Sequence, residues 1–395
     1  MRFDPKPAAL CAIMLFCAQP AQAVECGGDF TAWKNGFEAE AGREGIGPRG
    51  QQALDAAQID PNVLKRDRAQ GVFAQTFIEF SSRMVNAYRL KQGAANLNKY
   101  ADVFARAEAE FGVPPPVIAA FWALETDFGA VQGDFSTLDA LATLSHDCRR
   151  PELFRPQLMA LLKLIDLGTL PADVKGAWAG EIGQVQILPR DYLEKGVDGD
   201  GDGLVDLRGS APDAIMTAAN FVRQLGWQPG EPWIEEVRAP DDMPWEETGR
   251  TNRLPIAQWS QWGVTALDGS PLKDHGVPGG LVLPMGRNGP AFLVYPNYDV
   301  YLEWNQSFVY TLTAAHLADR LAGSPPYDER SPDPGLSIDE MKALQTLLQA
   351  RGHDVGKIDG VLGSGTREAV RQEQKRLGLA IDGWPTQELL ARLSA

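Results

Sequence analysis

Apolar residues recur at helical spacing through most of the first 322 residues. In 98–111, 151–167 and 211–225 they fall three or four positions apart, the spacing that brings side chains to one face of a helix. The same pattern over 305–321 predicts a last helix that closes this region. We therefore expect a mainly helical domain.

Residues 227–300 break this pattern. They are rich in proline, glycine and tryptophan, and they contain short extended runs such as Ala-Phe-Leu-Val-Tyr at 291–295. β-Branched and aromatic residues bounded by turn formers are typical of strands. We expect a small strand-containing subdomain here, which makes the fold class mainly α with a minor α+β part.

The C-terminal part is predicted to be a separate small domain. Residues 323–335 are dominated by glycine, serine, proline and aspartate, a composition that indicates a linker. Beyond it, 338–351 and 366–377 have helical patterns, and a shorter third pattern starts at 386. Because a unit of this size, 336–395, holds only a modest core, we expect a compact three-helix domain.

The N-terminus has the pattern of an export signal. Arg2 and Lys6 precede the apolar run 8–18, and Ala-Gln-Ala ending at residue 23 fits a cleavage site. We therefore expect residues 1–23 to be a signal peptide and the mature protein to be periplasmic and soluble. No later segment approaches the ~20 apolar residues of a membrane span, so no transmembrane anchor is predicted.

Loss of the signal peptide would leave two cysteines, Cys26 and Cys148. In an oxidising compartment two remaining cysteines usually pair, and we expect a disulfide between them. The alternative is two separate buried thiols.

The chain is acidic, with a formal net charge of −15. Nucleic acids and anionic membrane surfaces attract basic patches, so neither is expected as a partner. Long-range attraction cannot bring an acidic polymer to this chain. Such a substrate would have to be held by local contacts.

A helix is expected to begin at the prolines 114–116, because a first-turn proline gives up an N–H that had no partner. The run 117–124 is wholly apolar and leads into Glu125, and Gly129 is the expected stop.

Glu125 shares one face of this helix with Phe121 and Trp122, which lie four and three residues earlier. Burial beside aromatic rings disfavours the charged form and raises the pKa of a carboxyl. A glutamate that stays protonated near neutral pH is what a general acid for glycoside cleavage requires. The alternative is a helix-end glutamate that points to water.

A glycine-spaced loop over 180–189 carries Gln186. Glycine lets a backbone approach a ligand closely, and the Gln186 amide can donate and accept toward sugar hydroxyls or an N-acetyl group. Glycine-rich turns also serve purely structural purposes, and the loop alone does not decide between the two.

The run 198–206, Asp-Gly-Asp-Gly-Asp-Gly-Leu-Val-Asp, matches a calcium loop. Position 12 is Gly209 rather than the bidentate acid, and Asp213 is a candidate to close the site. We expect a structural Ca²⁺, because packed aspartates repel one another without a cation; the alternative is an empty acidic turn. The predicted ligands are Asp198, Asp200, Asp202, the Leu204 carbonyl and Asp206.

Aromatic and amide residues cluster at 295–310, a composition that suits stacking on sugar rings and equally suits the edge of a core. No nucleophile elbow, phosphate loop or dinucleotide fingerprint is present, and the four histidines lack metal-ligand spacing. No organic cofactor is therefore expected.

Taken together, these segments resemble the lytic murein transglycosylases of the B type (glycoside hydrolase family 103), over roughly residues 27–320. The tail, 336–395, resembles the small helical peptidoglycan-binding module. The segments that carry the first resemblance are 112–115, 124–129, 138–144, 179–186, the aspartate loop and 304–310.

The resemblance implies a lysozyme-like catalytic domain over 24–322 with peptidoglycan glycan strands as substrate and Glu125 as the single catalytic acid/base. Relatives often have a serine where this chain has Ala177, and a small residue where it has Glu181. The residues that the resemblance places around the substrate are Phe128, Gln186, Trp304, Asn305 and Tyr310.

The activity implied is cleavage of the bond between N-acetylmuramic acid and N-acetylglucosamine with formation of a 1,6-anhydro sugar. A hydrolase normally needs a second carboxylate at defined separation. Asp127 lies on another helix face, and Asp139 has the position of a residue capped by Ser136. The alternatives are a hydrolytic muramidase and a non-catalytic protein that binds the cell wall.

Overall fold

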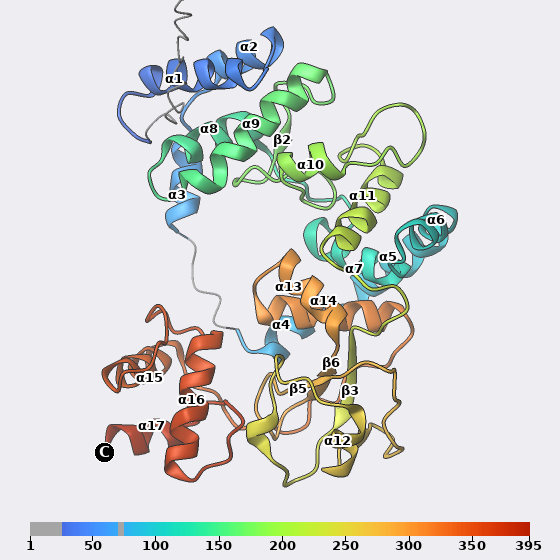
Figure 1. Ribbon diagram of the computed structural model, residues 1–395, viewed down its shortest axis with the longest axis vertical. Coiled ribbons are helices and arrows are strands. Elements are labelled where there is room, and N and C mark those ends of the chain that lie inside the picture. The colour runs from blue at the N-terminus through green and yellow to red at the C-terminus, as the bar shows by residue number, and fades with distance from the viewer. Residues whose placement is uncertain (1–25, 70–74) are drawn as a thin grey trace, which may run out of the picture.

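The computed structural model describes residues 26–69 and 75–395, and the predicted signal peptide lies outside this part of the chain. The fold is mainly helical, with two small antiparallel sheets (Figure 1). The principal elements before the linker are α1 (Phe30–Arg43), α2 (Pro48–Ala56), α3 (Pro61–Arg68), α4 (Phe77–Met84), α5 (Ala87–Lys99), α6 (Ala101–Phe111), α7 (Pro115–Thr126), α8 (Thr137–His146), α9 (Pro151–Leu167), α10 (Pro189–Lys195), α11 (Ala211–Gln224), α12 (Ile256–Gln261), α13 (Pro296–Trp304) and α14 (Phe308–Leu321).

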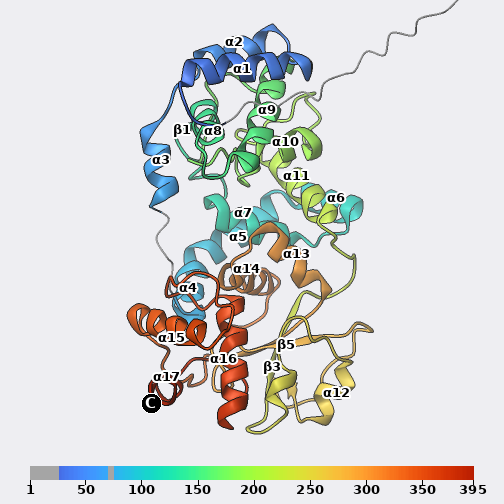
Figure 2. The ribbon, with the colours of Figure 1, turned by 60° about the vertical axis from the view of Figure 1, so that its left-hand side comes forward.

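Helix α7 lies at the centre of the domain, because its residues from 117 to 124 are all apolar and all buried. It packs against α14, α5 and α11 (Figure 2). The helix begins at Pro115, as expected, but it ends earlier than the predicted stop at Gly129. Asp127 adopts the left-handed conformation and terminates it. The expected helix over 98–111 is also divided, with Tyr100 between α5 and α6.

The predicted strand-containing subdomain is present. Strands β3 (Ile234–Arg238), β4 (Thr265–Ala266), β5 (Gly280–Val282) and β6 (Ala291–Val294) form an antiparallel sheet in the order β4-β3-β6-β5. Every residue of β5 and β6 is buried, because the sheet packs on the helical core through Phe292 and on its own apolar cluster through Leu293.

A second, two-stranded ribbon joins β1 (Phe135–Ser136) to β2 (Lys175–Gly176). It is directly connected to the predicted glycine loop, because the Ala177 N–H donates to the Glu181 carbonyl at 2.8 Å. The side chain of Ser136 caps α8 at the Asp139 N–H, at 3.3 Å, as the sequence predicted.

The C-terminal residues form three helices around their own core, as predicted: α15 (Ile338–Ala350), α16 (Ser364–Leu377) and α17 (Gln387–Ser394). This unit is docked on the sheet subdomain. Arg367 donates to the carbonyls of Leu283 and Pro284 at 3.3 and 3.2 Å, and Arg371 donates to the Glu246 carbonyl at 2.6 Å.

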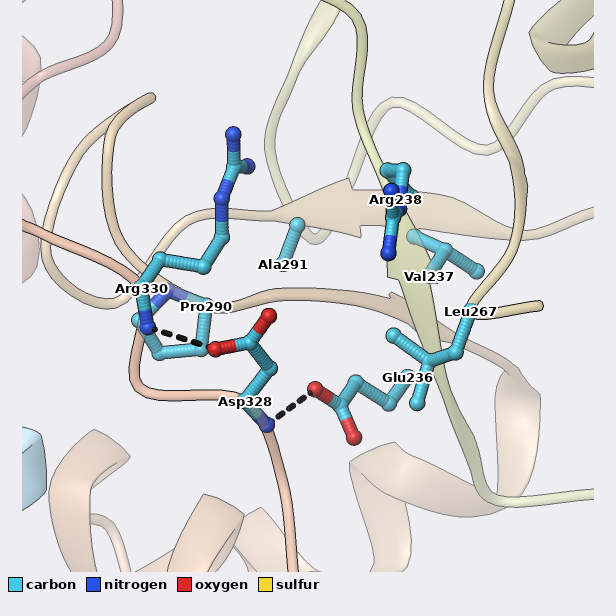
Figure 3. Close-up of a pocket in the computed structure, with 8 residues that line it drawn as sticks. All are labelled: Glu236, Val237, Arg238, Leu267, Pro290, Ala291, Asp328 and Arg330. Atoms are coloured by element: carbon cyan, nitrogen blue, oxygen red, sulfur yellow. Dashed lines mark hydrogen bonds between the residues drawn. The ribbon is translucent and has the colours of Figure 1, made fainter. Parts of the chain in front are cut away.

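The segment predicted as a linker is extended and held against the domains at several points. The Tyr327 hydroxyl lies 2.6 Å from the Ser81 hydroxyl, and the Asp328 N–H donates to Glu236 of β3 at 2.8 Å. Asp328 and Glu236 line a cavity of about 160 Å³ on the sheet (Figure 3). Burial raises the pKa of Glu236 to about 7.

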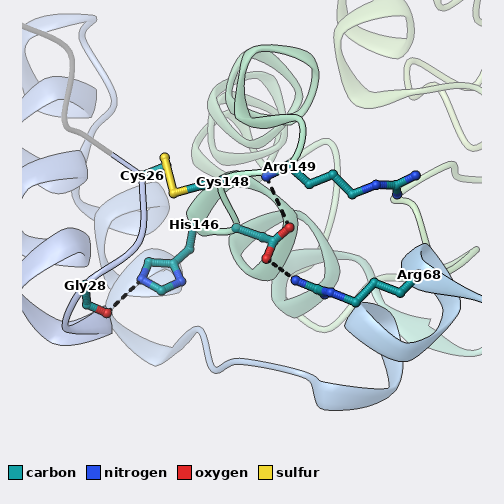
Figure 4. The surroundings of a disulfide bond; sticks show 7 residues. Cys26, Gly28, Arg68, His146, Cys148 and Arg149 are labelled. Atoms are coloured by element: carbon teal, nitrogen blue, oxygen red, sulfur yellow. Dashed lines mark hydrogen bonds and ion pairs between the residues drawn. A yellow bond between two sulfur atoms is a disulfide. The ribbon is translucent and has the colours of Figure 1, made fainter.

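The predicted disulfide is confirmed. Cys26 is bonded to Cys148, just after α8, and the bond closes a sequence separation of 122 residues (Figure 4). Close by, the His146 ring lies 3.2 Å from the Gly28 carbonyl, so the start of the described chain is fixed to the end of α8. Within residues 26–69 and 75–395, every helix is too short or too polar to cross a membrane.

Candidate active site

Glu125 lies in the last turn of α7, between two aromatic side chains from the C-terminal end of the domain. Trp304 donates its Nε1–H to Oε1 of Glu125 at 2.9 Å, and the Tyr310 hydroxyl donates to the same oxygen at 2.5 Å. The hydrogen bonds recorded for the carboxyl among the described residues all go to Oε1, and none goes to Oε2. One side of the carboxyl is therefore fixed, and the other is available to a ligand.

The surroundings of Glu125 oppose its ionisation. Burial raises the pKa of the Glu125 carboxyl, and the hydrogen bonds from Tyr310 and Trp304 offset part of that rise. The ring of Trp304 is held in place by stacking on Phe121 at 4.3 Å between centroids. The direction of the pKa shift agrees with the expectation from the sequence.

The backbone around Glu125 takes conformations that non-glycine residues rarely adopt. Among the described residues, four non-glycine residues have positive φ, and three of them are Asp127, Phe128 and Gln186. Such conformations cost of order 1–3 kcal/mol each and cluster at functional sites. Asp127 and Phe128 follow directly on the helix that ends in Thr126, so the strain lies beside the candidate acid.

The glycine loop is bound to α7 through Gln184, a residue that the sequence did not single out. Its Oε1 accepts from Trp122 Nε1 at 3.1 Å, and its carbonyl accepts from the Thr126 hydroxyl. At Gly183, with φ of 83°, a Cβ would lie 2.6 Å from Leu207, so the close approach requires glycine. The loop therefore has a structural function in addition to any contact with ligand.

The other predicted substrate residues contact neighbours other than Glu125. Gln186 donates its Nε2–H to the Gly183 carbonyl at 2.8 Å, and Asn305 accepts from the Ser307 N–H at 3.0 Å. Phe128 packs edge-on against Trp122 at 5.4 Å. The structure thus brings Trp304 and Tyr310 to Glu125 by direct hydrogen bonds, whereas it does not bond Gln186, Asn305 or Phe128 to the carboxyl.

The two carboxylates weighed in the sequence as a second catalytic group, Asp127 and Asp139, are already engaged. Asp127 accepts from Arg89 Nε at 2.6 Å, and Asp139 accepts from the Gln58 N–H at 2.8 Å. Glu181 differs, because its Oε2 is buried and has no partner in the described part of the chain. Burial raises the pKa of Glu181, and the charge of Glu125 raises it further. The sequence showed Glu181 only as a charge beside the glycine loop.

The predicted calcium ligands are partly assembled. Carboxylate oxygens of Asp198, Asp200 and Asp202 lie within 4.8 Å of one another, a donor set that fits Ca²⁺. Asp206 is not part of this cluster: its Oδ1 accepts from the Arg208 and Gly209 N–H groups.

Asp213, the candidate to close the calcium site, instead binds the backbone of the aspartate loop. Its Oδ1 accepts from the Gly199 N–H at 2.8 Å, and its Oδ2 accepts from the Asp206 N–H at 2.6 Å. Asp213 is 1% exposed, so it holds the loop from within.

Residues 29–319 match the transglycosylase SLT domain, and residues 337–393 match a peptidoglycan-binding domain. The chain belongs to the transglycosylase SLT domain family. This confirms the predicted membership of the lytic murein transglycosylases and the lysozyme-like, mainly helical fold of the SLT domain.

The relatives of this SLT domain protein include the membrane-bound lytic murein transglycosylase B of Escherichia coli, which is 30% identical over 248 aligned residues. The alignment covers 62% of this chain and 67% of the relative. SltB3 of Pseudomonas aeruginosa, solved with NAG-anhNAM-pentapeptide and with NAG-NAM-pentapeptide, is 36% identical with a TM-score of 0.86, covering 93% of this chain and all of that one. The lytic transglycosylase Slt35 of E. coli in complex with calcium is 27% identical with a TM-score of 0.62, covering 77% of this chain and 98% of that one.

Proposed function

We propose that this protein is a periplasmic lytic transglycosylase that cleaves the β-1,4 bond between N-acetylmuramic acid and N-acetylglucosamine in peptidoglycan and forms a 1,6-anhydro-muramoyl end. The observation that carries the proposal is the carboxyl of Glu125, whose Oε1 is held by Trp304 and Tyr310 while Oε2 has no hydrogen-bond partner in 26–69 and 75–395. Relatives solved with NAG-anhNAM and NAG-NAM ligands support it.

In the proposed reaction, protonated Glu125 donates its proton to the glycosidic oxygen, and the muramoyl C1 passes through an oxocarbenium-like state. The Glu125 carboxylate then takes the proton of the muramoyl C6 hydroxyl as that oxygen bonds to C1. Water is not consumed. One carboxyl suffices for both steps, because the nucleophile belongs to the same sugar and the ring positions it.

The pairing of nearby carboxylates favours this reaction over hydrolysis. A hydrolase of this kind needs a second carboxylate to activate water or to act as nucleophile. Asp127, the next carboxylate along the chain, is engaged by Arg89 and is not free to activate water.

The decisive variant is Glu125→Gln, which keeps the shape and the hydrogen bonds but cannot transfer the proton. We expect it to abolish release of soluble fragments from purified peptidoglycan, whereas the control Glu108→Gln, on the exposed face of α6, retains full release. Near-full activity of Glu125→Gln would refute the assignment. If circular dichroism shows that Glu125→Gln is unfolded, the folded variant Glu125→Asp is compared with the wild type instead.

Mass spectrometry of the wild-type products separates the candidate reactions. Anhydro ends are lighter than reducing ends by one water, so anhydro products support transglycosylation and reducing ends indicate a muramidase. A protein that binds peptidoglycan but releases nothing would be the non-catalytic alternative.

Four further assignments belong to this proposal: residues 1–23 as a cleaved signal peptide, 24–322 as the catalytic domain, 323–335 as the linker and 336–395 as the peptidoglycan-binding domain. We also assign a structural Ca²⁺ to Asp198, Asp200 and Asp202. The acidic cluster and the calcium complex of Slt35 support this assignment. The ion would neutralise the cluster and hold the loop closed.

A further inference from the structure

The C-terminal domain contains the same turn twice. Ile-Asp-Gly at 358–360 recurs at 381–383. In the first copy, Gln345 of α15 donates its Nε2–H to Asp359 Oδ1 at 3.4 Å and to the Val361 carbonyl at 3.0 Å. Its Oε1 accepts from the N–H of the turn glycine at 2.8 Å, so one amide holds the whole turn.

The second copy is held by the same three hydrogen bonds. Gln374 of α16 donates its Nε2–H to Asp382 Oδ1 at 2.8 Å and to the Trp384 carbonyl at 3.2 Å. Its Oε1 accepts from the Gly383 N–H at 2.9 Å. The two helix–turn units are therefore equivalent, and matching positions in them can be compared.

The second copy binds backbone groups of the segments that pack against it. Asp382 Oδ2 accepts from the Arg287 N–H at 3.1 Å, and Trp384 donates its Nε1–H to the Asp333 carbonyl at 3.0 Å. Both side chains are buried, with exposed fractions of 8% for Asp382 and 6% for Trp384. This face of the repeated unit thus binds polypeptide backbone.

The matching face of the first copy is exposed. Within the described part of the chain Asp359 accepts only through Oδ1, which leaves its Oδ2 available. Ile358 is 40% exposed. Ile338, whose Cγ2 lies 2.8 Å from the place that a Cβ on Gly360 would take, is 45% exposed. A hydrogen-bond acceptor therefore lies beside two exposed apolar side chains.

A cation also recurs in the two units. Arg371 precedes Gln374 by three residues and donates to the Glu246 carbonyl at 2.6 Å. Lys342 precedes Gln345 by three residues, and it is exposed. The open face, as we call it here, consists of Ile338, Lys342, Ile358 and Asp359.

The composition of the domain indicates which part of peptidoglycan fits the open face. Sugar rings are typically bound by stacking on aromatic side chains, and Trp384, the only Trp, Tyr or Phe in 336–395, is buried. A peptide instead offers backbone N–H groups to a carboxylate, carbonyls to an ammonium group and methyl groups to apolar side chains. We propose that the open face binds the peptide stems of peptidoglycan. This inference rests on the proposed function and names the group that the C-terminal domain recognises.

Sedimentation of the full chain with insoluble peptidoglycan tests the open face, in Glu125→Gln protein to prevent turnover. Asp359→Asn keeps the Oδ1 acceptor but replaces the Oδ2 acceptor by a donor, and we expect the Kd to rise about tenfold with an unchanged Tm. Asp382→Asn makes the same change in the second copy. It should leave the Kd unchanged and lower the Tm, because the Arg287 N–H loses its acceptor.

A second pair of variants leaves both turns intact. Lys342→Gln removes the exposed cation of the open face, and the Kd should rise about threefold. Lys375→Gln removes an exposed lysine of α16 outside that face and should leave the Kd unchanged. If Asp359→Asn lowers the Tm, this pair decides, and equal Kd values for its two members would overturn the inference.

Competition identifies the group that is bound. Free stem pentapeptide should displace the Glu125→Gln protein from peptidoglycan, and adding Asp359→Asn should raise its inhibition constant about tenfold. Chitopentaose, a glycan without peptide, should have the same inhibition constant for both proteins. An unchanged constant for the pentapeptide, or a raised constant for chitopentaose, would contradict recognition of the stem.

The outcomes separate this inference from the proposed function. Failure of the wild type to form anhydro ends would overturn the proposed function, whereas the binding constants decide the role of the open face. Equal Kd values for Asp359→Asn and its parent, with equal Tm, would overturn only that role.

Discussion

Tyr310→Phe should move the alkaline limb of the pH–activity profile to higher pH. The Tyr310 hydroxyl donates to Oε1 of Glu125 and stabilises its charged form, so it holds the pKa of Glu125 below the value that burial alone would give. A general acid acts only while protonated, and activity is lost as pH rises through its pKa. Removal of the hydroxyl therefore extends activity to higher pH.

The size of the shift follows from the hydrogen bond that is lost. A hydrogen bond to a charged group contributes about 1.5–3 kcal/mol, and 1.36 kcal/mol corresponds to one pH unit. We therefore expect the limb to move by about one to two pH units. Trp304→Phe should move it in the same direction, because Trp304 Nε1 donates to the same oxygen.

The assay is kcat/KM for release of soluble fragments, measured from pH 4 to 9 at constant ionic strength. Tyr301→Phe is the matched control: Tyr301 is fully buried beside Phe121, but its hydroxyl has no partner among the described residues, and the profile should not move. An unchanged or downward-shifted limb in Tyr310→Phe, with a normal melting temperature, would show that Glu125 is not the group that titrates.

Three predictions concern stability. Replacing both Cys26 and Cys148 by serine should lower the free energy of unfolding by about 4–5 kcal/mol, since the bond closes a separation of 122 residues; equal denaturant midpoints would contradict this. Burial raises the pKa of Asp319 to about 8, so the native state binds this proton more tightly than the unfolded state does. The free energy of unfolding of the wild type, relative to that of Asp319→Asn, should then fall by up to about 1.4 kcal/mol per pH unit as pH rises from 4 to 8. Denaturant titrations in which this difference between the two proteins does not change with pH would refute the prediction. EDTA should lower the melting temperature and Ca²⁺ restore it; identical melts with and without Ca²⁺ would exclude a structural calcium ion.

The sequence predicted the elements whose periodicity is strong. Helix α9 begins at Pro151 and ends at Leu167, the predicted bounds, and β6 lies within the extended run 291–295. The end of α7 was misplaced, because Asp127 takes a left-handed conformation that glycine supplies most often. Local residue preferences do not reveal such a position, which the surrounding contacts hold in place.

The candidate site was predicted unevenly. The apolar run before Glu125 shows in the sequence alone, but Trp304 and Tyr310 came to it only through the family resemblance. They are 179 and 185 residues away in the chain, and helical spacing carries no information on such contacts. That Glu181 Oε2 is buried without a hydrogen-bond partner among the described residues is likewise visible only in the three-dimensional structure.

The contacts of α16 with the sheet subdomain limit how the C-terminal domain can be exchanged for another. Arg367 and Arg371 satisfy carbonyl groups at Leu283, Pro284 and Glu246 on the other domain. A chimaera with a foreign wall-binding module that lacks these guanidinium groups would leave the carbonyls to water or unpaired. Successful exchange would require the recipient surface and the incoming helix to be transplanted together.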